Sequence, residues 1–521
     1  MAGILNSPFS ILNFYWNMRL FLFAIGGTGS RVLKSLIMLS AAGVRPVDEN
    51  GRPVPNVEIV PVIIDPHKSN EDLKRTEALL TAYRTLRERL YGNAVNADGF
   101  FATRFVTLKE IMSEGTIQLN DTFIFNLGAV EREKFRDFIG YDTMNEANQA
   151  LTSLLFADYQ LENKMNIGFV GSPNIGSVAL NEIKDSDEFK AFANVFNQGD
   201  RIFFISSIFG GTGAAGFPIM VKNIRQAKNL EINNRDVLRK APIGGLTVLP
   251  YFNIEHNEDH RIDKADFIVK TQSALYYYKD TMTGANDSNL NAIFYVGDQE
   301  VSKPYAYDPG EHGQRNRAHL VEMVGALAPL KFAGMPLNRL SDPDGFPLQT
   351  SAFEFALDKD ERDINFLTLR ATTRRLVYDP MVRFHLLFLY LRTGFRDQVG
   401  QGFTEDAPKI KSDFLNSQFY RTLTDDFMRA YVDWLVEMHD NNRSVSLFSL
   451  GETDMNRAIN AVGTRKSLLG RKNVDNNVFK AEMNRLSRDA RYSEHTVEFK
   501  LLDLFNRAAQ RIVNERYEGI N

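Results

Sequence analysis

The chain contains no cysteine among its 521 residues. Disulfide bonds, thiolate metal sites and a cysteine nucleophile are therefore excluded, and the absence fits a reducing compartment. An excess of charge of either sign is missing as well, because 61 Lys and Arg residues face 65 Asp and Glu residues, giving a formal net charge of −4. The composition thus provides no electrostatic evidence for binding to nucleic acid or to an anionic membrane.

Long uninterrupted apolar runs are also lacking. The apolar stretch 4–25 is broken by Asn6, Asn13, Asn17 and Arg19 and has no basic start, so it does not match a signal peptide. The apolar run 386–391 is far too short to span a bilayer. We therefore expect a cytoplasmic protein without a membrane span.

Histidine, another common metal ligand, occurs only 8 times. His256 and His260 are four residues apart, but no glutamate directly follows His256 as a His-Glu-x-x-His motif requires. A solvent-facing loop is the simpler interpretation of this pair, and the sequence does not predict a zinc site.

Short apolar runs typical of strands alternate with helical patterns along the first two thirds of the chain. This alternation predicts a parallel sheet covered by helices on both faces, with ligands at the carboxyl ends of the strands. The stretch 66–163 adds a charged helical pattern at 70–91 and strand-like pieces at 103–108 and 122–127, and we interpret it as an elaboration of the sheet domain. The main predicted strands are 19–25, 58–64, 167–170, 201–206, 244–250 and 291–296.

The pattern changes after Met335, where a polar loop leads into long helical periodicities at 365–377, 380–393, 411–438 and 476–515. We therefore predict three parts of the chain. They are an N-terminal extension at 1–17, a sheet domain at 18–335, and a mostly helical domain at 336–521.

Glycine-rich loops follow two of the predicted strands. The sequence Gly-Gly-Thr-Gly occurs at 26–29 and again at 210–213, each time between an apolar strand and a helical pattern. Glycines allow a tight turn and a close approach of the backbone, and amide groups at a helix start attract an anion. Both loops are candidate phosphate sites, although a tight strand-to-helix turn without a ligand is the alternative at each.

Two common nucleotide motifs can be compared with these loops. The Walker pattern is absent, because Lys34-Ser35 comes too late in the helix. Gly211, Gly213 and Gly216 satisfy the dinucleotide spacing, and Glu231 lies near the position of a ribose-binding acid. An NAD-dependent enzyme therefore stays an alternative, although that motif normally opens the first strand-helix unit rather than a later one.

The order of the segments resembles the tubulin and FtsZ superfamily of GTPases over 19–335. The most specific match is Phe209-Gly210-Gly211-Thr212-Gly213-Ala214-Ala215, which is similar to the tubulin signature loop. The segment 24–30, Ala-Ile-Gly-Gly-Thr-Gly-Ser, looks like the first phosphate loop of the family. The segment 171–176, Gly-Ser-Pro-Asn-Ile-Gly, is similar to the loop that senses the γ-phosphate.

Three further segments extend the resemblance. Ile63-Ile64-Asp65 looks like the strand end whose acid helps to hold the magnesium shell, although Asp65 could instead cap a turn. The segment 250–255 resembles the one whose acidic residue, here Glu255, faces the ribose. The segment 316–322 looks like the start of a central helix at 312–335, whose first asparagine, here Asn316, reads guanine; a helix cap is the alternative for Asn316.

The resemblance implies an α/β fold, a parallel Rossmann-like nucleotide-binding domain of tubulin/FtsZ type with a mostly helical C-terminal region. It also implies GTP or GDP and Mg²⁺ as cofactors, with Asp65 at the metal. Thr28 and Thr212 could alternatively bond only to local backbone. The residues assigned to the nucleotide are Gly26, Gly27, Thr28, Gly29, Ser30, Gly171, Asn174, Gly176, Gly210, Gly211, Thr212, Gly213, Ala214, Glu255 and Asn316.

Members of this superfamily hydrolyse GTP in assemblies, through an acidic residue on a loop after the central helix. Here the segment from Gly334 to Asn338 and Asp342 has the residue types but not the spacing, so no catalytic acid is assigned. Other acids nearby, Asp358, Asp360, Glu361 and Asp363, are equally unassigned.

The helical C-terminal third is a second departure from the family. We therefore expect a divergent bacterial-type member that associates with itself as a dimer or filament and contacts an unidentified protein through its helical region. The alternative is a nucleotide-binding scaffold without significant hydrolysis.

Overall fold

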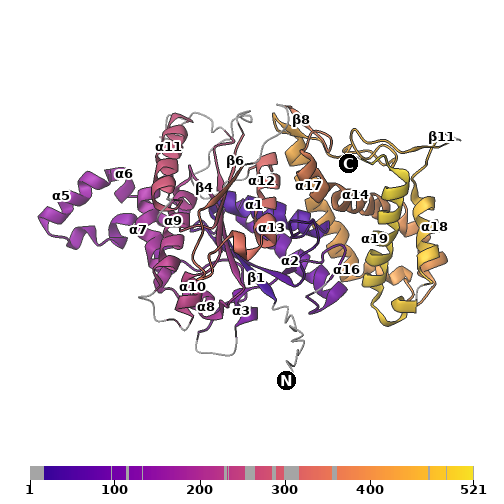
Figure 1. Ribbon diagram of the computed structural model, residues 1–521, viewed down its shortest axis with the longest axis horizontal. Helices are drawn as coiled ribbons and strands as arrows, with labels where there is room; N and C mark the ends of the chain where they lie inside the picture. The colour runs from indigo at the N-terminus through magenta and orange to yellow at the C-terminus, as the bar shows by residue number, and fades with distance from the viewer. Residues whose placement is uncertain are drawn as a thin grey trace, which may run out of the picture.

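The computed structural model describes residues 17–519 apart from 96, 113–116, 132, 170, 228–231, 233, 253–263, 284–288, 299–315, 355–360, 468–469 and 489. A central sheet flanked by helices carries a projecting arm on one side and a helical region on the other (Figure 1). The arm contains α5 (Glu146–Leu155) and α6 (Asp158–Leu161).

The sheet is parallel throughout, with the strand order β3-β2-β1-β4-β5-β6-β7. β1 has β2 on one side and β4 on the other, so the direction in which the sheet is built reverses between β1 and β4. In doubly wound sheets, the crevice for a ligand opens at the carboxyl ends of the two strands at such a reversal. The strands are β1 (Met18–Ile25), β2 (Val57–Ile64), β3 (Arg104–Phe105), β4 (Arg201–Ser207), β5 (Ile243–Val248), β6 (Ala292–Val296) and β7 (Ser351–Glu354).

Alternate side chains of the buried strands face two different helical layers. Phe23 of β1 stacks on Phe204 of β4, and Phe204 packs against Phe217 of α9 (Gly211–Arg225). On the opposite face, Phe203 packs against Phe332 of α13 (Leu327–Gly334). Burial on both faces explains why these strands are continuous apolar runs rather than alternating ones.

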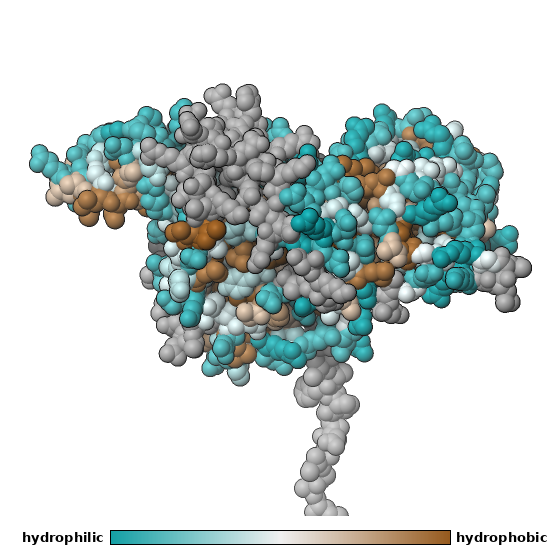
Figure 2. All heavy atoms as spheres, turned by 90° about the horizontal axis from the view of Figure 1, so that it is seen from above, coloured by the Kyte–Doolittle hydropathy of each residue, from teal (hydrophilic) through white to brown (hydrophobic). Residues whose placement is uncertain are grey.

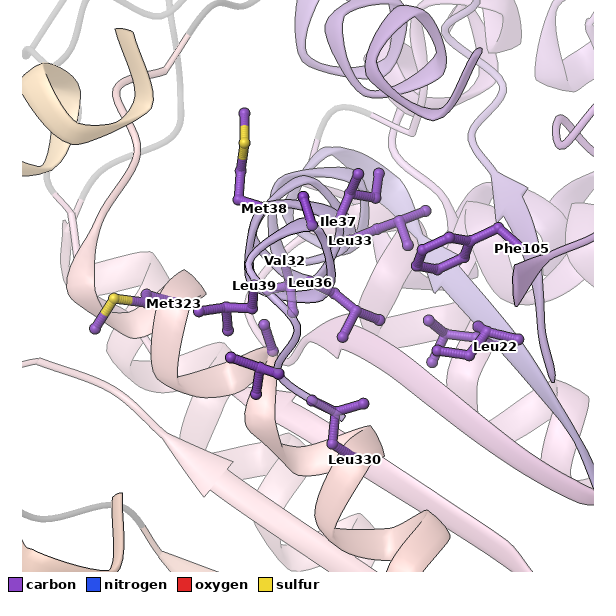
Figure 3. Packing of buried hydrophobic residues seen from close by; sticks show 14 of the residues in the cluster. Leu22, Val32, Leu33, Leu36, Ile37, Met38, Leu39, Phe105, Met323 and Leu330 are labelled. Atoms are coloured by element: carbon purple, nitrogen blue, oxygen red, sulfur yellow. The ribbon is translucent and has the colours of Figure 1, made fainter. Parts of the chain in front are cut away.

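Helix α1 (Gly26–Ala41) is the main helix of the second face. Its side chains Val32, Leu36 and Leu39 are fully buried. Figure 3 shows them with Leu22 of β1, while Met323 of α12 (Leu320–Gly325) lies to one side of the helix. The helix is thus held on the sheet by one apolar face, and this contact fixes where its N-terminus lies.

The predicted α/β fold with a mostly helical C-terminal region is confirmed. The predicted strand at 167–170 is wrong, because Met165–Ile167 forms a 3₁₀ helix and Gly168 has a φ of +85°, which ends any extended run. Of the two strand-like pieces in the elaboration, one forms the short β3 and the other makes only an isolated bridge between Ile63 and Ile124. The sheet also continues beyond Met335 into β7.

The C-terminal helices form a bundle. The predicted helices at 365–377 and 380–393 are a single helix, α14 (Ala371–Thr393), with Pro380 inside it. The other long helices of this region are α17 (Met428–His439), α18 (Asn476–Leu486) and α19 (Val497–Arg516). Its shorter elements are β8 (Asp363–Ile364), α15 (Phe395–Gln398), α16 (Gln418–Arg421), β9 (Ser444–Val445), β10 (Lys466–Ser467) and β11 (Gly470–Arg471).

The bundle is joined directly to the sheet domain. Trp434 of α17 is fully buried, and its Nε1 donates to Ser35 Oγ of α1 at 3.2 Å. Nearby, Glu437 of α17 accepts from Lys34 of α1 at 3.1 Å. The remaining helices of the sheet domain are α2 (Glu71–Tyr91), α3 (Leu108–Ile111), α4 (Phe135–Phe138), α7 (Pro173–Leu180), α8 (Asp187–Val195), α10 (Arg235–Arg239) and α11 (Lys264–Thr281).

The arm carries apolar side chains on its surface. Leu151, Leu154 and Leu155 of α5 are 56%, 84% and 63% exposed. Figure 2 shows a brown, hydrophobic area at the projecting end of the molecule, where α5 lies in Figure 1. Within the part of the chain that the structure describes, no helix is both long enough and apolar enough to cross a membrane.

His385 of α14 gives a first testable prediction. It is 3% exposed, and burial lowers its pKa to about 3. The pKa in the unfolded chain is about 6.5, so below that pH the unfolded chain binds the proton and stability is lost as pH falls. Between pH 6.5 and the lowered pKa, His385 should make the free energy of unfolding fall by about 1.4 kcal/mol per pH unit. Replacing His385 with Leu is expected to remove this contribution.

Urea unfolding at several pH values measures this slope in the variant and in the unmodified chain. His439→Leu is the matched control, because that imidazole is 49% exposed. Parallel stability curves for the unmodified chain and His385→Leu would show that His385 does not contribute to the pH dependence.

Candidate functional site

The two Gly-Gly-Thr-Gly loops lie side by side at the reversal point of the sheet. β1 and β4 are neighbours, with Ala24 opposite Ile205, and α1 and α9 begin directly beyond the two strands. Gly26 has a φ of +73°, and a Cβ at that position would lie 3.6 Å from Thr212 Cβ. Two helix N-termini therefore start at one point of the sheet edge, where both would attract an anion.

The third loop, 171–176, packs against the second. A Cβ on Gly211 would lie 3.1 Å from the amide nitrogen of Gly171, and one on Gly176 would lie 3.0 Å from the carbonyl oxygen of Gly211. The structure thus brings the three predicted loops together. The third loop arrives through α7, which packs on α9, and not from the end of a strand as the sequence indicated.

Two of the glycines have a packing reason that needs no ligand. A Cβ on Gly29 would lie 2.6 Å from the carbonyl carbon of Ala24, and a Cβ on Gly213 would lie 3.0 Å from the backbone of Ser207. Each of these glycines lets a helix start immediately above its strand. Gly210 and Ala214 lie in the same loop as Gly213. A Cβ on Gly210 would lie close to Ser207 Oγ.

Three polar side chains of the loops already have partners. Thr28 Oγ1 accepts from Arg31 at 3.3 Å, and Ser30 Oγ donates to the carbonyl of Gly26 at 3.4 Å. The exposed Asn174 accepts from Gln160 of the arm at 3.2 Å. The loop of Asn174 therefore also contacts the elaboration.

Asp65 follows β2 and is 4% exposed. Burial raises its pKa to about 7, although a hydrogen bond from the backbone nitrogen of His67 at 2.9 Å works against this rise. The carboxyl group thus closes a local turn, as the capping alternative predicted. Among the described residues, no group of three or more His, Asp or Glu side chains could hold a metal ion.

A buried ion-pair network beside the first loop was not predicted from the sequence. Arg31 of α1 is 4% exposed and donates to Asp72 at 3.0 Å and to Glu322 at 2.7 Å. Its other nitrogen donates to the Tyr251 hydroxyl at 2.7 Å, and that hydroxyl donates to Glu322 at 2.7 Å. The available signal was an arginine in the second turn of a mostly apolar helix.

This network continues into the C-terminal bundle through Arg75. Its guanidinium donates to Asp72 at 2.7 Å, to the Asn316 carbonyl at 2.9 Å and to Glu437 of α17. Glu437 also accepts from the backbone nitrogen of Ala318 at 3.1 Å. Arg31, which donates to Thr28 of the first glycine loop, is thus joined to the bundle by an unbroken chain of ion pairs.

Asn316 is buried beside this chain, with its Nδ2 3.5 Å from Asp72. The prediction that Asn316 starts the central helix and the alternative that it caps one are both wrong, because α12 begins at Leu320 with His319 as its N-cap. A second unpredicted contact comes from Lys270 of α11, which donates to the Gly171 carbonyl at 2.9 Å.

Several predicted positions lie away from the loops or cannot be placed. Glu255, Glu231, Asp358, Asp360, His256 and His260 lie outside the described residues. Asp342 accepts from the Phe346 backbone in the turn before β7, at the edge of the sheet opposite the glycine loops. Asp363 lies on β8, which pairs with β9 in the bundle.

No protein-family profile matches the sequence, and no curated protein matches it. The structures that the fold retrieves include CetZ2 from Haloferax volcanii, a GTPγS-bound protofilament, with TM-score 0.25, 12% identity and coverage of 54% of this chain and 49% of that chain. TubZ from Bacillus thuringiensis serovar israelensis, in GDP-form protofilaments, gives TM-score 0.23 and 12% identity over 55% of this chain and 46% of that chain. Both belong to the tubulin/FtsZ superfamily, and the match spans about half of each solved chain.

Proposed function

We propose that this chain binds GTP or GDP in the crevice between the ends of β1 and β4. The observation that carries the proposal is the convergence of three glycine loops at the reversal point of the sheet, with two helices starting there. Because the glycines of these loops have no side chains, their backbone amides are accessible to a ligand. Backbone amides at helix starts bind phosphates.

In this proposal the loops at 26–30, 171–176 and 210–214 hold the phosphates. Arg31 is a buried cation that contacts the first loop, and Lys270 is a half-buried cation that contacts the third. Asp65 contributes to a Mg²⁺ shell in its charged form, while Glu255 and Asn316 face the ribose and the base. Hydrolysis would need only positioning and charge stabilisation of an in-line water attack.

We further propose that turnover depends on self-association in the cytoplasm. Asp342, the acid in the segment that most resembles the family's catalytic loop, lies at the opposite edge of the sheet from the glycine loops. An acid at that edge reaches a nucleotide only in a neighbouring copy. The bundle at 336–521 would then receive the nucleotide signal, with 18–335 as the binding domain and 66–163 as its elaboration.

The nucleotide released when the purified protein is denatured tests the binding proposal. We expect guanine nucleotide by chromatography, and we expect calorimetry with the emptied protein to give binding of GTP that NAD does not compete away. Retention of NAD together with indifference to GTP would refute the proposal and favour the dinucleotide alternative.

GTP turnover over a range of protein concentrations tests the assembly step. A rate that rises more than linearly with protein concentration is expected, because each site would be completed by a second copy. Binding without turnover at any concentration would instead indicate the scaffold alternative.

A further inference from the structure

An apolar groove crosses the sheet edge opposite the glycine loops. Its volume is about 760 Å³, within the range of about 300–1,000 Å³ that is typical of ligand pockets. Its large apolar side chains are exposed, with Val237 at 37%, Leu337 at 50% and Leu348 at 38%. The lining also includes Phe196, Ala241 and Pro242.

The chain contains one segment whose composition suits such a groove. Residues 1–18 include no Asp, Glu, Lys or Arg. Transfer of a segment this rich in large apolar side chains from water into an apolar groove is favourable. No charged side chain of the segment has to leave water in that transfer. The large apolar residues of the segment are Ile4, Leu5, Phe9, Ile11, Leu12, Phe14, Tyr15 and Trp16.

The start of β1 places this segment beside the groove. The backbone nitrogen of Arg19 donates to Asp200 at 3.0 Å, and its guanidinium forms an ion pair with the same carboxylate at 2.6 Å. Asp200 itself lines the groove. Residues 1–16 would reach at most about 50 Å when extended, so every part of the groove lies within their range, and the short tether gives a millimolar effective concentration.

The charges of the groove and of the segment favour the groove over a lipid surface as the binding partner of the segment. Among the described residues that line the groove, Asp236, Asp342 and Asp344 are at least partly exposed and face one cation, Lys240, while Asp200 is buried in its ion pair with Arg19. An acidic rim repels anionic lipid headgroups, and the segment lacks the Lys and Arg residues typical of interfacial membrane anchors. An uncharged apolar peptide avoids both penalties.

We propose that residues 4–16 pack into this groove of their own chain and cover it. The groove then acts as an intramolecular docking site for the N-terminal segment. The proposal does not rest on nucleotide binding, because the groove and the glycine loops lie at opposite edges of the sheet. Asp342 lines the groove, so docking of the segment and the proposed contact of Asp342 with a neighbouring copy compete for this face.

Trp16 provides the test, because the chain has only two tryptophans and the other, Trp434, is fully buried. Emission and acrylamide quenching of Trp16 are measured in full-length Trp434→Phe, or as the difference from Trp16→Phe if Trp434→Phe is destabilised. We expect the blue-shifted, protected emission of a buried indole. Adding Leu337→Asp and Leu348→Asp should shift the emission to the red and raise the quenching constant several-fold.

Leu151→Asp with Leu154→Asp is the matched control, because these leucines are exposed on the arm and should leave Trp16 unchanged. Quenching of Trp16 that is the same with and without the groove substitutions would overturn the proposal. A red-shifted emission that turns blue only when phosphatidylserine vesicles are added would also overturn it, in favour of a membrane segment.

The absence of cysteine allows a second test with Ile11→Cys and Leu348→Cys in one full-length chain. Oxidation is expected to give a disulfide within single chains, seen as a faster-migrating monomer. Disulfide-linked dimers would show that the groove takes the segment of a second copy and would overturn docking in the same chain.

Discussion

Arg31→Met is expected to lower the free energy of unfolding by about 3–5 kcal/mol. The guanidinium is 4% exposed, and both of its carboxylate partners, Asp72 and Glu322, are fully buried. Among the described residues, removing it leaves Glu322 with the Tyr251 hydroxyl and a backbone nitrogen as donors, while Asp72 keeps Arg75. An uncompensated buried charge is the costly outcome, and the lost attraction alone would cost less.

Urea unfolding measures this loss, and two further variants identify its cause. Arg31→Met combined with Glu322→Gln should recover part of the stability, because the unpaired charge is then gone. Arg511→Met is the control, since that arginine is 48% exposed beside Glu515 and should change stability by less than about 1 kcal/mol. A double variant as unstable as the sum of both single variants would rule out the buried charge as the cause.

The pH dependence gives the same prediction an internal check. Burial raises the pKa of Glu322 above its ordinary value, and loss of Arg31 should raise it further. A group with a raised pKa keeps its proton in the folded state when the unfolded chain has lost it, so stability falls as pH rises. The deficit of Arg31→Met should therefore be larger at mildly alkaline pH than at mildly acidic pH.

The strands and both Gly-Gly-Thr-Gly loops could be predicted because their signals are local. A continuous apolar run such as 19–25, followed by glycines, predicts both a buried strand and a turn from about ten consecutive residues. The predicted strand at 167–170 failed because an apolar run of four residues does not distinguish a strand from a buried turn. There, Met165 and Phe169 are buried on either side of Gly168, whose left-handed backbone breaks the run.

The ion-pair network could not be predicted because its members are far apart in sequence. Arg31, Asp72, Tyr251 and Glu322 come from four segments that only the packing of α1, α2 and α12 brings together. A charged residue read singly is most often on the surface. The same holds for the bundle. Its helices could be predicted from the sequence, but the ion pair between Glu437 and Lys34 that joins it to the sheet domain could not.

Gly211→Ala is expected to weaken GTP binding at least about tenfold, or about 1.4 kcal/mol, while the fold is retained. The new Cβ would lie 3.1 Å from the amide nitrogen of Gly171 and 3.1 Å from Phe169 Cβ, so the second and third loops must move apart. Their separation would misplace the amides that we propose bind the phosphates. The structural cost is that of an overpacked contact, about 1–3 kcal/mol.

Two other glycines show whether the effect belongs to the loops. Gly29→Ala places its Cβ 2.6 Å from the carbonyl carbon of Ala24, where strand backbone cannot yield, so it should reduce stability more than Gly211→Ala does. Gly519→Ala meets only the end of Arg465 at 3.7 Å and should change neither stability nor binding. Calorimetric titration with GTP and urea unfolding separate the two properties. Unchanged GTP affinity in a folded Gly211→Ala protein would mean that phosphate binding does not require contact between the two loops, and the proposed site would then be wrong.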